Sequence, residues 1–181
     1  LYCWGEANAI APVRTTDVLS PQIVEGQFSA VDTFNRDTCA VALQQPTTLK
    51  GWGEFFSGQY GSPLSFNSAI DTVSIGEYFG CAHLKSNDVS CWGVNNWGQL
   101  GAGEDVAVSS PMEVNVGVPL VGVDSGLRHA CAVDISRRVW CWGNNIWGST
   151  GSGRDEQAIF IPVEVVGLSG AIAVTSGGYF S

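Results

Sequence analysis

Apolar and polar positions alternate along much of the chain, and elsewhere apolar residues gather in runs of four to six that are rich in Val, Ile, Phe and Trp. Gly, Asn, Asp, Ser or Pro breaks these runs every 8–12 residues. This pattern is typical of short β-strands joined by tight turns, whereas an amphipathic helix repeats its apolar positions every 3.6 residues. The sequence therefore predicts an all-β protein.

One order of features recurs along the chain. A Trp-Gly pair returns at steps of 48, 40 and 50 residues, at Trp4, Trp52, Trp92 and Trp142. Each full unit carries four short candidate strands, and repeats of this length with four strands are typical of β-propeller blades. We assign the units to residues 1–28, 29–72, 73–122, 123–172 and 173–181, of which the first and the last are partial.

The length of the chain sets the number of blades. At 40–50 residues per unit, 181 residues hold about three and a half blades, whereas closed propellers have about four to eight. An open stack would expose two wide apolar blade faces, which natural repeat proteins cap or close. We therefore expect this chain to be a segment of a longer polypeptide or assembly, truncated at both ends.

Two cysteine pairs indicate the redox environment in which the protein is found. Cys81 and Cys91 stand ten residues apart, as do Cys131 and Cys141, and each pair brackets a turn between two candidate strands. Cross-strand positions in such a hairpin lie within reach of a disulfide. Two disulfides favour an oxidising compartment.

Other interpretations of the cysteines stay open. A zinc site would need closer ligand spacing, because no Cys-x2-Cys occurs and His83 and His129 stand at different places in their units. Reduced thiols in a cytoplasmic protein are the other alternative. Cys39 supports that alternative, because Gly51 takes the place of its partner.

Charge and hydropathy exclude several classes of partner. The chain has 8 basic and 17 acidic residues, a net charge of −9, and offers no basic stripe. Such a surface repels phosphate backbones, so we expect no nucleic-acid partner. No apolar run approaches the roughly 18 residues that would indicate a membrane span.

The motifs of the third and fourth units resemble a known repeat. They are Ser-Gly-x-x-His-x-Cys-Ala-Val at 125–133, Val-x-Cys-Trp-Gly-x-Asn at 139–145 and Gly-Gln-Leu-Gly at 98–101. Together they resemble the regulator of chromosome condensation (alpha-tubulin suppressor-like) repeat, in the cysteine-bearing version of many bacterial and extracellular proteins. The resemblance implies a seven-bladed propeller, of which this chain supplies roughly half.

The tryptophans divide into two groups. Those of the Trp-Gly pairs are large enough to fill the space between neighbouring blades, and a leucine of the following loop packs back onto the blade. We assign this structural core to Trp4, Trp52, Trp92, Trp142 and Leu100. Trp97 and Trp147 occupy equivalent loop positions instead, and exposed tryptophans are favoured interface anchors. These two are our candidate partner-binding residues.

The sequence favours binding over catalysis. It contains no Gly-x-Ser-x-Gly, no His-Glu-x-x-His and no phosphate-binding glycine loop, so we assign no catalytic residue, metal or cofactor. We expect a non-catalytic protein-recognition or assembly module, extracellular or at the cell surface. The alternative that the resemblance implies is an intracellular, cytoplasmic guanine-nucleotide exchange or signalling scaffold.

Overall fold

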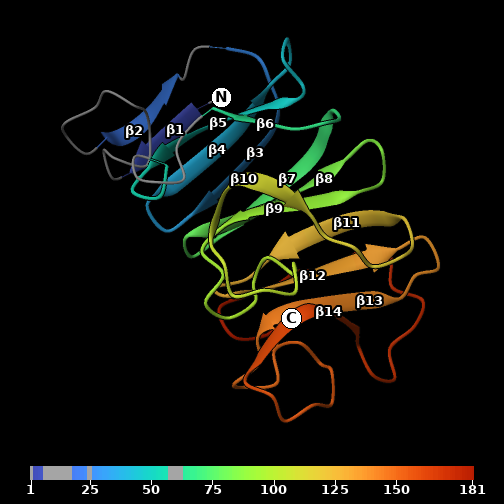
Figure 1. Ribbon diagram of the computed structural model, residues 1–181. Helices are drawn as coiled ribbons and strands as arrows, with labels where there is room; N and C mark the ends of the chain where they lie inside the picture. The colour runs from blue at the N-terminus through green and yellow to red at the C-terminus, as the bar shows by residue number, and fades with distance from the viewer. Residues whose placement is uncertain (1, 6–17, 24–25, 57–62) are drawn as a thin grey trace.

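The computed structural model describes residues 2–5, 18–23, 26–56 and 63–181 (Figure 1). These residues form strands, turns and loops and no helix. A first pair of strands, β1 (Tyr2–Gly5) and β2 (Val18–Ile23), makes a two-stranded antiparallel sheet. The remaining strands make three four-stranded sheets. The prediction of an all-β protein is confirmed.

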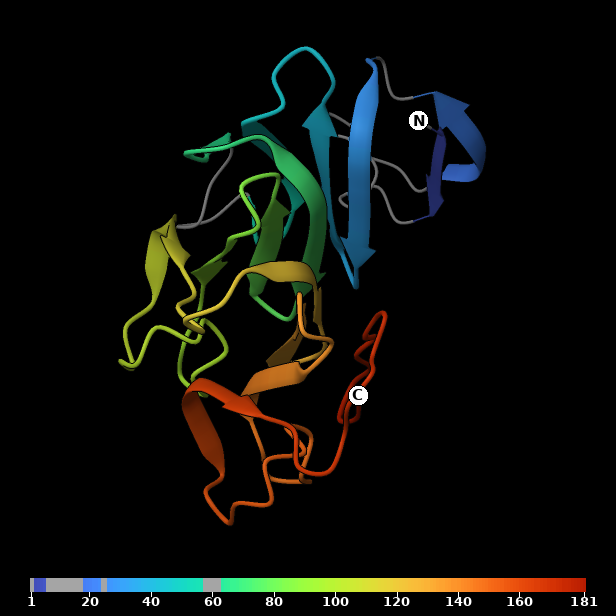
Figure 2. The same ribbon diagram turned by 90° about the vertical axis from the view of Figure 1, so that its right-hand side faces the viewer.

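Each four-stranded sheet is an antiparallel meander, in which spatial neighbours are also neighbours in the chain. Blade 1 consists of β3 (Phe28–Phe34), β4 (Asp37–Ala42), β5 (Thr48–Gly53) and β6 (Leu64–Ser65). Blade 2 consists of β7 (Ile70–Gly76), β8 (Phe79–Leu84), β9 (Val89–Gly93) and β10 (Val108–Glu113). Blade 3 consists of β11 (Leu120–Ser125), β12 (His129–Asp134), β13 (Val139–Asn144) and β14 (Ala158–Glu164). Figures 1 and 2 show the blades following one another in chain order, which is the arrangement of a β-propeller.

The first strands of neighbouring blades are fastened to each other. β7 contacts both β3 and β11, and one polar side chain of each first strand accepts a hydrogen bond from a backbone N–H of the next unit. Asp32 accepts from Ile75 at 2.7 Å, Ser74 from Ser125 at 3.0 Å, and Asp124 from Ser176 at 2.6 Å. These three acceptors stand seven residues before Cys39, Cys81 and Cys131. The repeat therefore includes a polar link between blades, which satisfies a backbone donor at each boundary.

Tryptophans fill the space between the blades. Trp92 is fully buried in a cluster that joins β9 to blade 1, and it meets the ring of Phe66 edge-on at 5.7 Å between centroids. Trp142 is fully buried in the cluster between blades 2 and 3, where Leu100 is buried too. Its indole Nε1 donates to the carbonyl of Gln99 in blade 2 at 2.9 Å. Trp92 of blade 2 therefore packs against blade 1, and Trp142 of blade 3 packs against blade 2.

Two further tryptophans belong to the predicted core. Trp52 of β5 is buried. Trp4 lies in β1, and its side chain is outside the described part of the structure.

Two disulfides cross the middle of blades 2 and 3. Cys81 faces Cys91 in the register of β8 and β9, Cys131 faces Cys141 in that of β12 and β13, and the sulfurs of each pair are bonded. In blade 1, Cys39 faces Gly51 and is a buried free thiol. A Cβ on Gly51 would lie 2.2 Å from the ring of Phe56, so an aromatic ring fills the place of the second cysteine.

Prolines stand in the outermost strands. Pro21 lies in β2, Pro111 in β10 and Pro162 in β14, and β10 and β14 are edge strands of their sheets. A proline removes one backbone donor from an exposed edge, which hinders pairing with a strand of another chain. The outer edges of blades 2 and 3 are therefore poor sites for strand addition.

Candidate protein-interaction face

The strand order places two kinds of connection at one end of each blade. Because the strands are antiparallel and follow the chain, the turn from the first to the second strand and the loop from the third to the fourth lie at the same end. In the described residues this end comprises the turns 35–36, 77–78, 127–128 and 178–179 and the loops 94–107 and 145–157. We call it the turn-loop face.

A buried asparagine shapes each of the two long loops. The side-chain oxygen of Asn95 accepts from the backbone N–H of Leu100 at 2.9 Å, and its amide nitrogen donates to the carbonyl of Glu104. Asn145 does the same in blade 3, accepting from Thr150 at 3.3 Å and donating to Glu156 at 2.9 Å. In both loops, hydrogen bonds between the buried asparagine side chain and the backbone of the same loop therefore stabilise the loop conformation. The sequence motif Trp-Gly-x-Asn marks these asparagines, although sequence reasoning gave them no role.

The structure gives the two candidate binding tryptophans different environments. Trp97 is half-buried, and its loop lies against the last strand of blade 3: a Cβ on Gly98 would lie 2.6 Å from the carbonyl oxygen of Ile159. Trp147 is 73% exposed. It borders a groove of about 620 Å³ that is also lined by Tyr179 and Phe180. The two environments differ because blade 3 covers the loop of Trp97, whereas no further blade in the described residues covers the side of blade 3 that Val139, Cys141 and Trp147 line.

A row of four turn residues, which the sequence analysis did not single out, lies on the same face. Three of them stand three residues before Cys39, Cys81 and Cys131, and the fourth follows Gly177 by two residues as its counterparts follow Gly76 and Gly126. Each is the second central residue of its turn. The row consists of Arg36, Tyr78, Arg128 and Tyr179. The two arginine side chains are 53% and 40% exposed, and the two tyrosines 42% and 54%. We call these residues the turn row.

His129 follows Arg128 and is structural. Its ring is buried, and its Nε2 lies 2.8 Å from the hydroxyl of Ser181. Burial lowers the pKa of His129 below the ordinary histidine value, although a backbone hydrogen bond and Asp124 oppose the shift. The neutral ring is therefore favoured, which suits a packing role between blade 3 and the residues after it.

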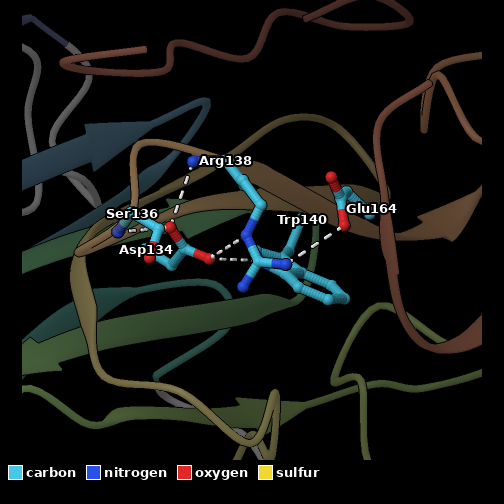
Figure 3. Close-up of polar contacts among 5 residues, drawn as sticks. All are labelled: Asp134, Ser136, Arg138, Trp140 and Glu164. Carbon is cyan, nitrogen blue, oxygen red and sulfur yellow. Dashed lines mark hydrogen bonds and ion pairs between the residues drawn. The ribbon is translucent and has the colours of Figure 1, made fainter. Parts of the chain in front are cut away.

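A polar cluster lies at the opposite end of blade 3, in the turn between β12 and β13 (Figure 3). The carboxylate of Asp134 is fully buried. It accepts from the side chains of Arg138 at 2.9 Å and Trp140 at 3.0 Å, and from the backbone N–H groups of Ser136 and Arg138. Arg138 also lies over the ring of Trp140, 5.2 Å from its centroid, and pairs with Glu164 at 3.4 Å. Every member has a partner within the cluster, so its role is to fix the turn.

In the described part of the chain, no three of His, Cys, Asp and Glu come together in a way that could hold a metal ion. The same residues include no helix long and apolar enough to span a membrane. The turn-loop face, with its exposed aromatic and arginine side chains, is the surface whose composition resembles an interface.

Comparison with known families agrees with the repeat seen in the structure. The regulator of chromosome condensation (RCC1) repeat matches residues 87–133, and a second description of that repeat matches residues 121–146. These stretches contain the first three strands, the disulfide cysteines and the buried tryptophan of blade 3. The chain belongs to the RCC1 repeat family. The cysteine-bearing character seen in its sequence corresponds to the two disulfides.

The RCC1 assignment is supported by individual proteins. The human E3 ubiquitin-protein ligase HERC2 is 30% identical over an alignment of 149 positions that covers 71% of this chain and 3% of that protein. Among solved structures, human WBSCR16 superposes with a TM-score of 0.81 at 21% identity, over 98% of this chain and 51% of that one. Prp20p of Saccharomyces cerevisiae superposes with a TM-score of 0.80 at 18% identity, over 98% of this chain and 49% of that one. The RCC1 chain described here thus spans about half the length of these structures.

Proposed function

We propose that this chain is a non-catalytic protein-recognition or assembly module that binds a protein partner through its turn-loop face. The observation that carries the proposal is the exposed indole of Trp147, which lines a groove together with Tyr179 and Phe180 on the side of blade 3 that no further described blade covers. Hydrogen bonds of Asn145 hold the loop that carries it. Tryptophan, tyrosine and arginine are the residue types that dominate binding energy in protein interfaces. A rigid scaffold also reduces the entropy lost when a partner binds.

Two further observations support this proposal. The structure of Prp20p, which has the same fold, is described together with binding to Gsp1p and histones, so this type of propeller serves as a binding surface in at least one protein. The prolines in the outer strands make edge pairing unfavourable, which leaves the ends of the blades for recognition.

The compartment is part of the same proposal. The two disulfides are more common in oxidising environments than in the cytoplasm. We therefore place the chain in an extracellular or cell-surface setting. An intracellular exchange factor or signalling scaffold would instead keep Cys81, Cys91, Cys131 and Cys141 reduced, as Cys39 is.

A peptide-display experiment tests the proposal. A phage library of random twelve-residue peptides is selected on the immobilised chain, and the affinities of the enriched peptides are measured by fluorescence anisotropy. We expect Trp147→Ala to weaken these peptides at least tenfold, because hot-spot tryptophans contribute about 2 kcal/mol or more. The matched control is Ile135→Ala, an exposed apolar residue at the opposite end of blade 3, which should leave the affinities unchanged. Equal binding by the Trp147 variant would place recognition elsewhere.

A further inference from the structure

The turn row alternates between two residue types around the blades. Arginine, tyrosine, arginine and tyrosine occupy the same turn position in four consecutive units, at Arg36, Tyr78, Arg128 and Tyr179. The chain as a whole has more than twice as many acidic as basic residues. The row therefore concentrates two of eight basic residues and two of four tyrosines of the sequence on one line of turns.

Backbone hydrogen bonds hold part of this row in a fixed arrangement. The N–H of Glu77 donates to the carbonyl of Leu127 at 2.9 Å, and the N–H of Leu127 donates to the carbonyl of Gly177 at 3.1 Å. The turns that carry Tyr78, Arg128 and Tyr179 are thus tied directly to each other. Close approach here depends on glycine, since a Cβ on Gly126 would lie 2.4 Å from the carbonyl oxygen of Gly177.

Arg128 stands between Tyr78 and Tyr179 in the row, and a contact with the neighbouring blade orients its side chain. Its Nε donates to the carboxylate of Glu77 in the neighbouring blade. That hydrogen bond is the main reason why the pKa of Arg128 is raised, and the phenol groups of Tyr179 and Tyr78 act in the same direction. The backbone links described above place the turns of Tyr78 and Tyr179 on either side of the turn that carries Arg128.

The guanidinium group has more donors than this ion pair uses. Arginine carries five N–H donors, and the contact with Glu77 is made by Nε. The side chain is 40% exposed, so its Nη atoms are available to an acceptor that approaches the face. A carboxylate matches this edge, because its two oxygens accept two parallel N–H bonds. Tyrosine hydroxyls at both sides add donors to the same acceptor.

We propose that the turn row binds an acidic segment of a protein partner, with Arg128 anchoring a carboxylate side chain and Tyr78 and Tyr179 flanking it. The inference rests on the proposed recognition function and names the chemistry of its partner. The charge of −9 does not oppose such a contact strongly, since at physiological salt charges beyond about 8 Å are largely screened. The carboxylates paired with the row, Glu54 and Glu77, are already engaged by Arg36 and Arg128.

Binding of a fluorescein-labelled hexaglutamate peptide tests this inference, with hexaserine as the comparison peptide. We expect the chain to bind hexaglutamate at least tenfold more tightly than hexaserine, with an affinity that falls as salt is raised. Arg128→Ala should remove most of that preference, and Arg128→Lys should recover part of it, because lysine keeps the charge but not the paired donors. Tyr179→Phe should weaken binding a few-fold.

The controls separate a local site from general charge effects and from misfolding. Arg137→Ala removes an equal charge from a turn at the opposite end of blade 3 and should leave hexaglutamate binding unchanged. Glu77→Gln removes the internal partner of Arg128 and should leave binding equal or stronger. The inference is overturned if hexaglutamate binds no better than hexaserine, or if Arg137→Ala weakens it as much as Arg128→Ala. Peptides selected on the same face that depend on Trp147 would then still support the recognition function.

Discussion

Replacing Trp142 by alanine is expected to lower the free energy of unfolding by about 3–5 kcal/mol. The indole is fully buried between blades 2 and 3 and packs in a cluster with Phe79, Leu100 and Leu120. Its removal leaves a cavity that the two rigid sheets cannot close, and it also leaves the carbonyl of Gln99 without the donor it has at 2.9 Å. Urea unfolding followed by far-ultraviolet circular dichroism measures the effect as a shift of the midpoint.

The matched control is Trp147→Ala, which removes the same side chain from the same unit but from an exposed loop position. Because 73% of that residue is already in solvent, we expect a change within about 0.5 kcal/mol. Similar losses for both variants would mean that the two tryptophans do not differ as the structure shows. The proposed packing of Trp142 between blades 2 and 3 would then be wrong.

Replacing Asp134 by asparagine is expected to cost on the order of 2–3 kcal/mol at pH 7. The buried carboxylate accepts four hydrogen bonds, and asparagine keeps its size but loses its charge and one of its acceptors. Arg138 would lose its buried partner and keep only Glu164, which is 45% exposed. Glu164→Gln is the control, because exposed pairs contribute about 0–1 kcal/mol. A cost below that of the control would contradict a structural role for the carboxylate.

The cost of this substitution should depend on pH in a defined direction. Burial alone would raise the pKa of Asp134, but the hydrogen bonds from Trp140, Arg138 and Ser136, together with the charge of Arg138, outweigh it and lower the pKa below the ordinary 3.8. A lowered pKa gives stability that is present above the unfolded value and is lost as pH falls through the folded value. The difference between wild type and variant should therefore shrink in unfolding curves measured below pH 3.8.

Other carboxylates shift in the opposite direction, so the comparison must use the difference between two proteins. Burial raises the pKa of Asp32, although hydrogen bonds from Ile75 and Thr33 oppose it. Its contribution is present below pH 3.8 and is lost as pH rises through the folded pKa. Wild type and the Asp134 variant share this contribution, and it cancels between them.

Much of the fold could be predicted because each unit repeats the same local pattern. The alternation of apolar residues indicates strands, and the spacing of Trp92 and Trp142 indicates blades. The cysteine spacing of ten residues places two sulfurs opposite each other in a hairpin, as the bonded pairs show. These features depend either on residues that are close together in the chain or on a comparison of one unit with the next. Both kinds of information are present in a single sequence.

The candidate site was harder to predict because it depends on what covers each residue. Trp97 and Trp147 stand in the same motif, but the loop of Trp97 lies on β14 whereas Trp147 borders an open groove. Three members of the turn row could have been found by aligning the residues three before Cys39, Cys81 and Cys131, and Tyr179 by its place two residues after Gly177. The role of Asp134 could not have been found in this way, because blade 2 carries Leu84 at the equivalent position. The carboxylate therefore does not recur between units.

Hydrogen exchange of the tryptophan indole groups, followed by nuclear magnetic resonance of the nitrogen-15-labelled chain, tests the account most directly. The account holds that one tryptophan of each unit packs between blades while Trp147 faces solvent. It predicts that the Nε1–H of Trp142, bonded to the carbonyl of Gln99, is strongly protected and that the Nε1–H of Trp147 exchanges freely. Equal exchange at both positions, or protection at Trp147 alone, would contradict it.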